Sequence, residues 1–351
     1  MKTKNLKNLL KAALLAAPVI VSCSKNEASS PEAGESARTV SLRMSLDSPS
    51  NDVKGTTAWT KEQEKAVVSW QVFVFNDDGS LDVAQYKTGG GSAELICTLG
   101  KKHVYALVNH DTDLTGSTDK ESDLLALKSN LSSNIPGTSF VMFGEQNITV
   151  STSTSATIKV DRICSKVYID SITNSLSGSY GKITVKGIYI INAAGDAVLG
   201  NDKYIPATGG SWYNKKKYSA SGISSVEAML YDGGLSETIA RGASTSTPHY
   251  FYCYPNLSTA SGSESAWSPR CSRLVVETVI EGDSAERRYY SINLFGNSGA
   301  GVERNKYYHI KSLTIKHLGT LDPDKTVDSG TMTFSLQVTD WTEGFNKEVE
   351  I

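Results

Sequence analysis

The sequence predicts an all-β protein, and three observations support this fold class. Apolar and polar residues alternate with period two in many short runs, which is typical of strands that bury one face. The 29 glycines and the abundant serines and threonines supply turns between these runs. Runs with helical spacing are few. At 351 residues, the chain is long enough for two domains with separate cores.

The run around which the chain is organised begins at Thr39. Polar residues separate its four apolar residues, which are Val40, Leu42, Met44 and Leu46. One face of the run is therefore apolar and the other is polar, which predicts a strand with one buried face.

A polar loop follows this strand and extends to Lys65, with Lys54-Gly55 near its centre. Exposed polar loops are preferred sites of proteolysis, so Lys54 is the first candidate for a cleavage site. Arg38 and Arg43 are the alternatives, although both lie at or inside the predicted strand. If the loop is cut, the strand can leave and open a groove.

The N-terminus reads as an export signal. Lysines precede an apolar stretch from about Leu9 to Val21, which is too short to span a membrane and is typical of a signal peptide. The stretch ends in I-V-S-C, which predicts that residues 1–22 are removed and that Cys23 carries a lipid such as palmitate. The alternative is an ordinary signal peptide with an incidental cysteine. Residues 23–37 are small and polar, which predicts a flexible tether.

Further strands are predicted in two groups of similar size. The first group comprises residues 67–75, 95–98, 103–109, 140–144, 147–150 and 156–160. The second group comprises residues 163–170, 182–192, 250–254, 272–281, 287–295 and 306–315. We expect an N-terminal β-sandwich over residues 38–160 and a C-terminal β-sandwich over residues 161–351.

One or two short helices are expected between these strands. Thr118-x-x-Glu121 has the spacing of a capping box, and three leucines follow it at helical spacing, namely Leu124, Leu127 and Leu131. A second short helix is predicted within residues 224–231. The rest of residues 193–247 is expected to form long loops with short strands.

The end of the chain repeats the pattern of its start. Four apolar residues alternate with polar ones before a break at residues 342–344, and they are Met332, Phe334, Leu336 and Val338. The alternation resumes with Val349 and Ile351. These residues predict one or two strands that can fill the groove of a neighbouring subunit as donor strands. A hairpin within the same subunit is equally compatible with the pattern.

Four cysteines remain besides Cys23. Cys253 and Cys271 flank a loop between two predicted strands, so a disulfide between them is geometrically allowed. Cys97 and Cys164 lie in apolar strand-like runs. Buried free thiols are an equally good interpretation for all four.

Enzymatic and nucleic-acid-binding functions find no support. The sequence contains no G-x-S-x-G, Walker or G-x-G-x-x-G motif, so no catalytic residue and no cofactor-binding or metal-binding residue is predicted. The formal net charge is −2, and the one basic run, residues 215–217, is too short to suggest a nucleic-acid surface.

The main alternative from another class is a monomeric surface lipoprotein that binds glycans or acts as an adhesin. The segment 193–247 contains aromatic residues that can stack on sugars, namely Tyr204, Trp212, Tyr213, Tyr218 and Tyr231. The competing interpretation is that these rings pack the loops onto the sandwich. An exposed coplanar pair would favour sugar binding.

Several segments, taken in order, resemble the fimbrillins of Bacteroidetes, of the type that forms the major subunit of surface fimbriae. They include V-V-S-W-Q-V-F-V-F-N from Val67 and V-Y-A-L-V-N from Val104. The segment from Ile158, I-K-V-D-R-I-C-S-K-V-Y-I, places Arg162 where the family has an arginine. V-E-R-N-K-Y-Y-H-I-K from Val302 and L-Q-V-T-D-W from Leu336 complete the resemblance.

The resemblance implies two β-sandwich domains of transthyretin-like topology and export as an outer-membrane lipoprotein. It also implies that a surface protease cuts after the first strand and that the C-terminal strands of the next subunit fill the groove. The cut follows arginine in well-known members, whereas the matching loop here offers Lys54. The implied partners are other fimbrial subunits, the protease, the membrane before cleavage and a host or bacterial receptor. Tip and anchor subunits share this fold.

Overall fold

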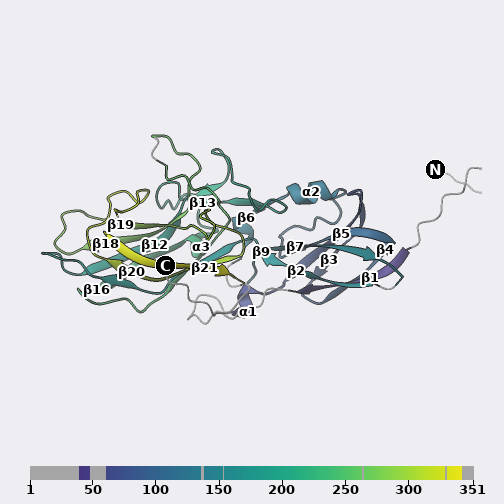
Figure 1. The fold of residues 1–351 in the computed structure, drawn as a ribbon, viewed down its shortest axis with the longest axis horizontal. Coiled ribbons are helices and arrows are strands. Elements are labelled where there is room, and N and C mark those ends of the chain that lie inside the picture. The colour runs from purple at the N-terminus through teal and green to yellow at the C-terminus, as the bar shows by residue number, and fades with distance from the viewer. Residues whose placement is uncertain are drawn as a thin grey trace, which may run out of the picture. The chain divides into compact units, whose positions relative to one another are not determined.

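The computed structural model of the chain describes residues 39–47, 61–135, 138–152, 154–262, 265–328 and 330–341. Strands dominate these residues, as the sequence predicts (Figure 1). None of the helices in these ranges is long and apolar enough to cross a membrane. Several predicted features lie outside the described residues, namely the signal peptide and tether, Cys23, Arg38, Lys54, Val349 and Ile351.

Two facing sheets make up the first half of the described chain. The smaller sheet has the order β4-β1-β8 and consists of β1 (Thr39–Asp47), β4 (Ser92–Thr98) and β8 (Thr154–Lys159). The larger sheet has the order β3-β2-β5-β7-β9. Its strands are β2 (Ser69–Asn76), β3 (Leu81–Thr88), β5 (Gly100–Val108), β7 (Met142–Val150) and β9 (Asp161–Arg162). A buried apolar cluster with members from both sheets fills the space between them.

Two sheets of four and five strands make up the second half. One has the order β16-β12-β18-β19, with β12 (Ile183–Ile191), β16 (Tyr231–Ile239), β18 (Arg273–Ile280) and β19 (Arg288–Asn293). The other has the order β11-β20-β10-β17, and β21 also pairs with β20. Its strands are β10 (Ser165–Ile169), β11 (Ile172–Asn174), β17 (His249–Cys253), β20 (Lys306–Ile315) and β21 (Met332–Asp340).

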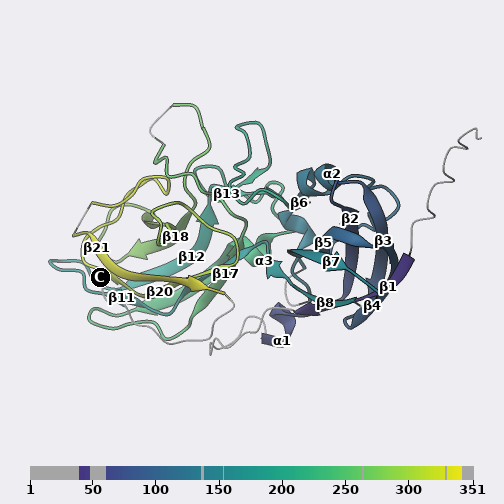
Figure 2. The same ribbon diagram turned by 45° about the vertical axis from the view of Figure 1, so that its right-hand side comes forward.

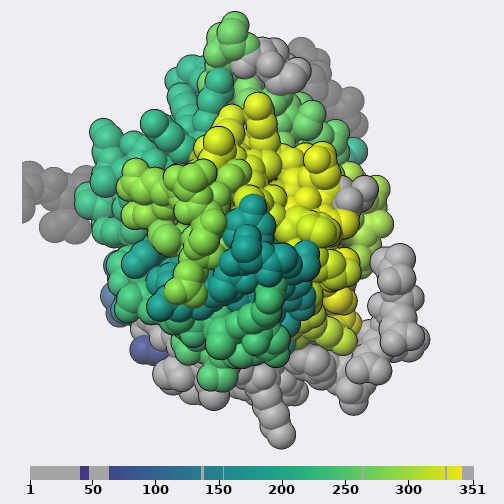
Figure 3. Space-filling model, turned by 90° about the vertical axis from the view of Figure 1, so that its left-hand side faces the viewer, coloured from purple at the N-terminus to yellow at the C-terminus, as the bar shows by residue number. Residues whose placement is uncertain are grey.

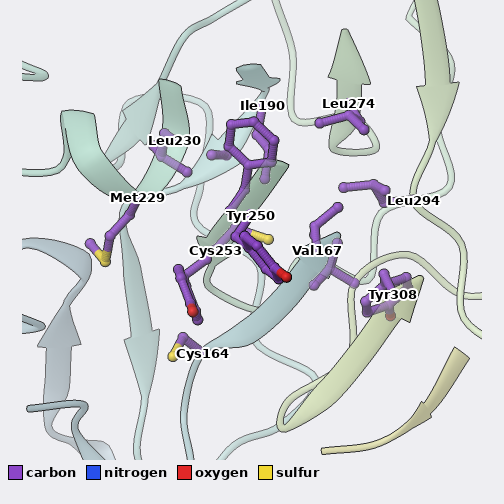
Figure 4. Close-up of a cluster of buried hydrophobic side chains, with 14 of the residues drawn as sticks. Cys164, Val167, Ile190, Met229, Leu230, Tyr250, Cys253, Leu274, Leu294 and Tyr308 are labelled. Carbon is purple, nitrogen blue, oxygen red and sulfur yellow. The ribbon is translucent and has the colours of Figure 1, made fainter. Parts of the chain in front are cut away.

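The larger core cluster lies between these two sheets. Figure 4 shows Val167, Ile190, Leu274 and Tyr308 gathered from four different strands. The cluster also includes Phe73 on β2, so apolar packing continues from the first half of the chain into the second. Because β2 buries side chains on both of its faces, its sequence is nearly continuous in apolar residues.

Short elements connect the sheets. Three are helices of four to six residues, namely α1 (Lys61–Glu64), α2 (Glu121–Ala126) and α3 (Glu227–Leu230). A 3-10 turn, η1, spans Leu131–Ser133. Two short strand pairs complete the described elements, β6 (Lys128–Asn130) with β14 (Asp196–Val198), and β13 (Ala193–Ala194) with β15 (Trp212–Tyr213).

The helix predicted after Thr118 is present but shorter than its leucine spacing suggests. The capping-box prediction is wrong, because Lys120 is the N-cap and makes no side-chain cap. The carboxylate of Glu121 instead accepts hydrogen bonds from His103 and from the hydroxyl of Tyr105. The helix ends at Ala126 because β6 follows at once and pairs with β14, so Leu131 begins a separate turn.

Among the longer strands, two escape sequence-based prediction. β16 is a nine-residue edge strand inside the segment that was expected to be mostly loop. Gly233-Gly234 interrupts its alternation, and several of its side chains are exposed, so its apolar pattern is weak. β3 is likewise an edge strand with intermediate burial along most of its length. The segments predicted at residues 140–144 and 147–150 form one strand, β7.

The four cysteines in the described residues are buried free thiols, so Cys253 and Cys271 do not form a disulfide. Cys253 lies within the core shown in Figure 4, and its burial raises the pKa of the thiol to about 12. Cys271 instead contacts the side chain of Asn293, with 3.5 Å between Sγ and Oδ1.

A buried ion pair between β3 and β5 of the larger sheet in the first half also contacts Thr98 of β4 in the smaller sheet. Lys102 Nζ lies 2.7 Å from Asp82 Oδ2, and the two side chains are 1% and 9% exposed. Burial alone would raise the pKa of Asp82, but hydrogen bonds from Lys102 and Thr98 outweigh it and lower the pKa. The contribution of Asp82 to stability is therefore present above about pH 4 and is lost as the pH falls through the folded-state pKa.

Replacing Asp82 by asparagine should lower the free energy of unfolding by about 3–5 kcal/mol at pH 7, because Lys102 remains buried without its counter-charge. The difference from the wild type should shrink as the pH is lowered below about 4. Urea denaturation across this pH range measures both effects. The exposed Glu94→Gln variant serves as the control and should stay within about 0.5 kcal/mol. A difference that does not depend on pH would contradict this account.

Candidate assembly site

The first strand, β1, lies in the middle of its sheet. It pairs antiparallel with β4 from Thr39 to Ser45 and parallel with β8 from Leu42 to Asp47. Figure 2 draws β1 in purple beside β4. Because β1 is hydrogen-bonded along both edges, its removal would leave two facing edges with unpaired backbone groups.

The side chains of β1 alternate as the sequence predicts. Leu42 and Met44 are fully buried, Val40 and Leu46 are partly buried, and Ser41 and Arg43 are exposed. Below the buried side chains lie apolar residues of β2 and β5, including Trp70, Val72, Val74, Val104 and Ala106. Removal of β1 would therefore expose an apolar groove as well as the two strand edges.

The position of Arg43 bears on its role as a cleavage candidate. Its side chain is exposed, but its backbone lies in the middle of both ladders, opposite Glu94 on β4 and Ser155 on β8. Cleavage by a protease requires local opening of the backbone, so Arg43 is poorly placed as long as β1 stays paired.

The C-terminal strand, β21, forms an antiparallel hairpin with β20 of the same chain, with a register shift between Ile310 and Ser312. The intramolecular hairpin that the sequence allowed is thus the arrangement of the described residues. Within them, β20 is the only strand that pairs with β21, so the outer edge of β21 carries no strand, although the carbonyl of Val338 accepts a hydrogen bond from the side chain of Asn297. In Figure 3 the C-terminal part of the chain, in yellow, forms part of the surface in view.

The apolar face of β21 is incompletely buried in this position. Met332 and Val338 are 9% and 8% exposed, Leu336 is half-buried, and Phe334 is 42% exposed. An open cavity of about 310 Å³ runs along this face, between β21 and β19. It is lined mainly by apolar side chains, namely Ile292, Phe295, Val327, Met332, Phe334 and Leu336. Two of the four apolar side chains of β21 therefore remain accessible.

The aromatic residues that suggested glycan binding make contacts within the protein, and two of them stack on each other. The rings of Tyr218 and Tyr231 stack face to face, with centroids 3.9 Å apart and an angle of 17° between the ring planes. Tyr189 tilts against both rings. The indole of Trp212 donates to the carbonyl of Ala207, and Tyr204 accepts from Lys128. The stacked pair is partly buried and does not present two rings side by side to solvent.

Within the described ranges, no group of three or more His, Cys, Asp or Glu residues is arranged to hold a metal ion. Asp113 belongs to a segment whose spacing is similar to the start of a calcium-binding loop. Its carboxylate accepts hydrogen bonds from the backbone N–H and the hydroxyl of Thr115. It therefore acts as a turn cap.

The fold and part of the sequence match known fimbrial proteins. Residues 39–182 match the family model described as the major fimbrial subunit protein, FimA. The structure is similar to a crystal structure of a fimbrilin from Porphyromonas gingivalis W83, with a TM-score of 0.61 and 14% identity over 86% of this chain and 98% of that one. No curated protein sequence matches the chain.

Two further crystal structures share the fold. A proposed cell adhesion protein from Bacteroides eggerthii gives a TM-score of 0.62 and 18% identity, over 87% of this chain and 97% of that one. The tip fimbrial protein Mfa3 from Porphyromonas gingivalis, with a C-terminal truncation, gives a TM-score of 0.54 and 13% sequence identity. The match covers 87% of this chain and 100% of that one.

The sequence match over residues 39–182 and the shared all-β fold both point to structural subunits of fimbriae as the class of protein that the chain resembles. The resemblance to fimbrillins predicted from the sequence is therefore confirmed by the family model over residues 39–182 and by the shared fold.

Replacing Met44 by alanine should lower the free energy of unfolding by about 2–5 kcal/mol, because it leaves a cavity under β1. Ser41→Ala, on the exposed face of the same strand, should change it by less than about 0.5 kcal/mol. Urea denaturation of the two variants measures the difference. Equal effects would show that the buried face of β1 does not contribute as described.

Proposed function

We propose that this chain is a polymerising fimbrial subunit in which proteolysis releases β1 and the C-terminal strand of a neighbouring subunit takes its place. The observation that supports this proposal best is the position of β1. It is a terminal strand that sits in the centre of a sheet, with two buried apolar side chains and a ladder on each edge. A donor strand satisfies both strand edges and refills the apolar groove.

β21 has the pattern that the groove requires. Its apolar residues follow the same i, i+2 spacing as Val40, Leu42, Met44 and Leu46, and they are of similar size. Burial of all four in the groove would contribute roughly 6–12 kcal/mol as an upper bound. In the hairpin, β21 buries only two of them well, so transfer to a groove offers additional burial that offsets the loss of its pairing with β20. Val349 and Ile351 extend the donor segment in this proposal.

The remaining features of the proposal come from the sequence. Cleavage occurs in the loop at Lys54, and release of β1 separates the subunit from its lipid at Cys23. Before cleavage, that lipid holds the exported subunit in the outer membrane. The two pairs of sheets form tandem sandwiches of transthyretin-like topology that meet near Val160. The β6–β14 pair is one of the contacts that join them. Head-to-tail donation does not close on itself, so it produces a filament that serves adhesion.

Limited proteolysis of the purified full chain with a lysine-specific protease tests the proposal. A cut near Lys54, located by N-terminal sequencing, should be followed by a ladder of large oligomers in gel filtration. The variant Lys54→Ala should remain uncut and monomeric, whereas Lys65→Ala, on the far side of α1, should behave like the wild type.

Deletion of Lys347–Ile351 should reduce polymer growth. Truncation after Thr331 should abolish polymer growth, although the loop at Lys54 should still be cut. A chain that is cut at Lys54 but stays monomeric would overturn the polymerising role and favour a tip or anchor subunit. Resistance of the loop to cleavage would overturn the Lys54 assignment.

A separate measurement addresses the lipid. Cells that express the wild-type chain should incorporate labelled palmitate into it, and the Cys23→Ser variant should lose both the label and its recovery with outer membranes before cleavage. Incorporation of the label by Cys23→Ser would contradict the lipoprotein assignment.

A further inference from the structure

The residue that follows β21 is anchored far more firmly than the strand itself. Trp341 is 1% exposed. Its ring centroid lies 5.7 Å from the ring of Phe140 and 5.7 Å from that of Tyr252, and the guanidinium carbon of Arg162 lies 4.2 Å from the indole centroid. Its backbone N–H donates to the carbonyl of Asn305 at 2.9 Å. Trp341 therefore holds the end of β21 on its own subunit.

The same cluster also anchors α1, the first described element after the loop that contains Lys54. Glu64, at the end of α1, is buried. One of its carboxylate oxygens accepts from Lys166 Nζ at 2.6 Å and from the hydroxyl of Tyr252 at 2.5 Å. Its backbone carbonyl accepts from Arg162 Nε at 2.8 Å. Arg162 and Tyr252 thus contact both Glu64 and Trp341.

The electrostatic balance of this cluster depends on Glu64. Arg162 and Lys166 are buried cations, and burial lowers the pKa of both, to about 10 for Arg162, while the charge of Glu64 opposes that shift. If Glu64 leaves, Lys166 loses the carboxylate that it contacts, and Arg162 loses a nearby negative charge and the backbone carbonyl that accepts from its Nε. Removal of one partner from a buried ion pair strongly destabilises the surrounding structure.

The cluster is also incompletely hydrogen-bonded. The two terminal nitrogens of Arg162 and the indole nitrogen of Trp341 are buried and have no hydrogen-bond partner within the described structure. Unpaired buried donors cost free energy, and they regain hydrogen bonds when the site opens to water. Apart from the backbone hydrogen bond to Asn305, Trp341 is therefore held by packing and by the stacked guanidinium, and its indole N–H makes no hydrogen bond.

We propose that Glu64, Lys166, Tyr252, Arg162 and Trp341 form a latch that couples α1 to the end of β21. While Glu64 remains bound to Lys166 and Tyr252, Arg162 and Tyr252 pack against Trp341, and β21 remains paired with β20. When α1 detaches, water hydrates the two cations, Arg162 and Lys166. Trp341 then leaves its buried position, and β21 becomes available as a donor strand. This inference rests on the proposed function, because cleavage of the preceding loop is the event that loosens α1.

Hydrogen–deuterium exchange of the intact, uncut protein tests the latch. In Glu64→Gln, the amides of residues 332–340 should exchange at least tenfold faster than in the wild type, while those of β18 stay unchanged. Glu121→Gln is the matched control, since Glu121 also accepts from a tyrosine hydroxyl but belongs to α2. It should leave the exchange of β21 unaltered. Unchanged exchange of β21 in Glu64→Gln, or an equal increase in β18, would overturn the proposal.

Reciprocity provides the second readout. If the two elements are coupled, Trp341→Ala should accelerate exchange at residues 63–66 by the factor by which Glu64→Gln accelerates it at β21. The double variant should then add little to either single variant. Independent, additive effects would mean that Glu64 and Trp341 act locally, which would overturn the coupling. Because both measurements use uncut monomers, they can fail while cleavage-dependent polymerisation succeeds, and the reverse.

Discussion

The structure depends on the two-sided pairing of β1. A strand at the edge of a sheet can be lost with one ladder, but β1 completes two ladders at once and covers the apolar floor formed by β2 and β5. Its loss therefore exposes strand edges and hydrophobic surface at the same place, which is an unstable arrangement in water. A groove of this kind is refilled most effectively by another strand with the same alternation. In the proposed mechanism, the first strand is thus both a structural element and a temporary occupant of a binding site.

β21 presents the complementary situation. It is fully paired with β20 along one edge, yet Phe334 is exposed and a cavity runs beside it. An edge strand that leaves part of its apolar face accessible keeps less stabilisation from its own subunit than it would gain in a closed groove. In the proposed mechanism, the difference in burial between the two environments favours transfer of β21 to the groove, and cleavage makes that groove available.

The junction between the two halves of the chain holds buried charges beside the end of β21. Arg162 and Lys166 lie close together in sequence, but their partners come from α1 and from the residue after β21. Charged and aromatic groups there are buried more completely than the apolar residues of β21 itself. Control over β21 is consequently located at its end and not along its length.

The sequence by itself determined the all-β class, most strands, the alternating faces of β1 and β21 and the resemblance to fimbrillins, because period-two patterns and segment order are local properties of the chain. It did not reveal β16 or β3, since edge strands bury too little to impose a pattern, and it extended α2 too far because the pairing of β6 with β14 is a long-range contact. Only the tertiary structure decided that β1 is central in its sheet, that β21 lies on β20 of its own chain, and that Glu64 and Trp341 share partners. These facts depend on residues distant in sequence whose contacts leave no trace in local spacing.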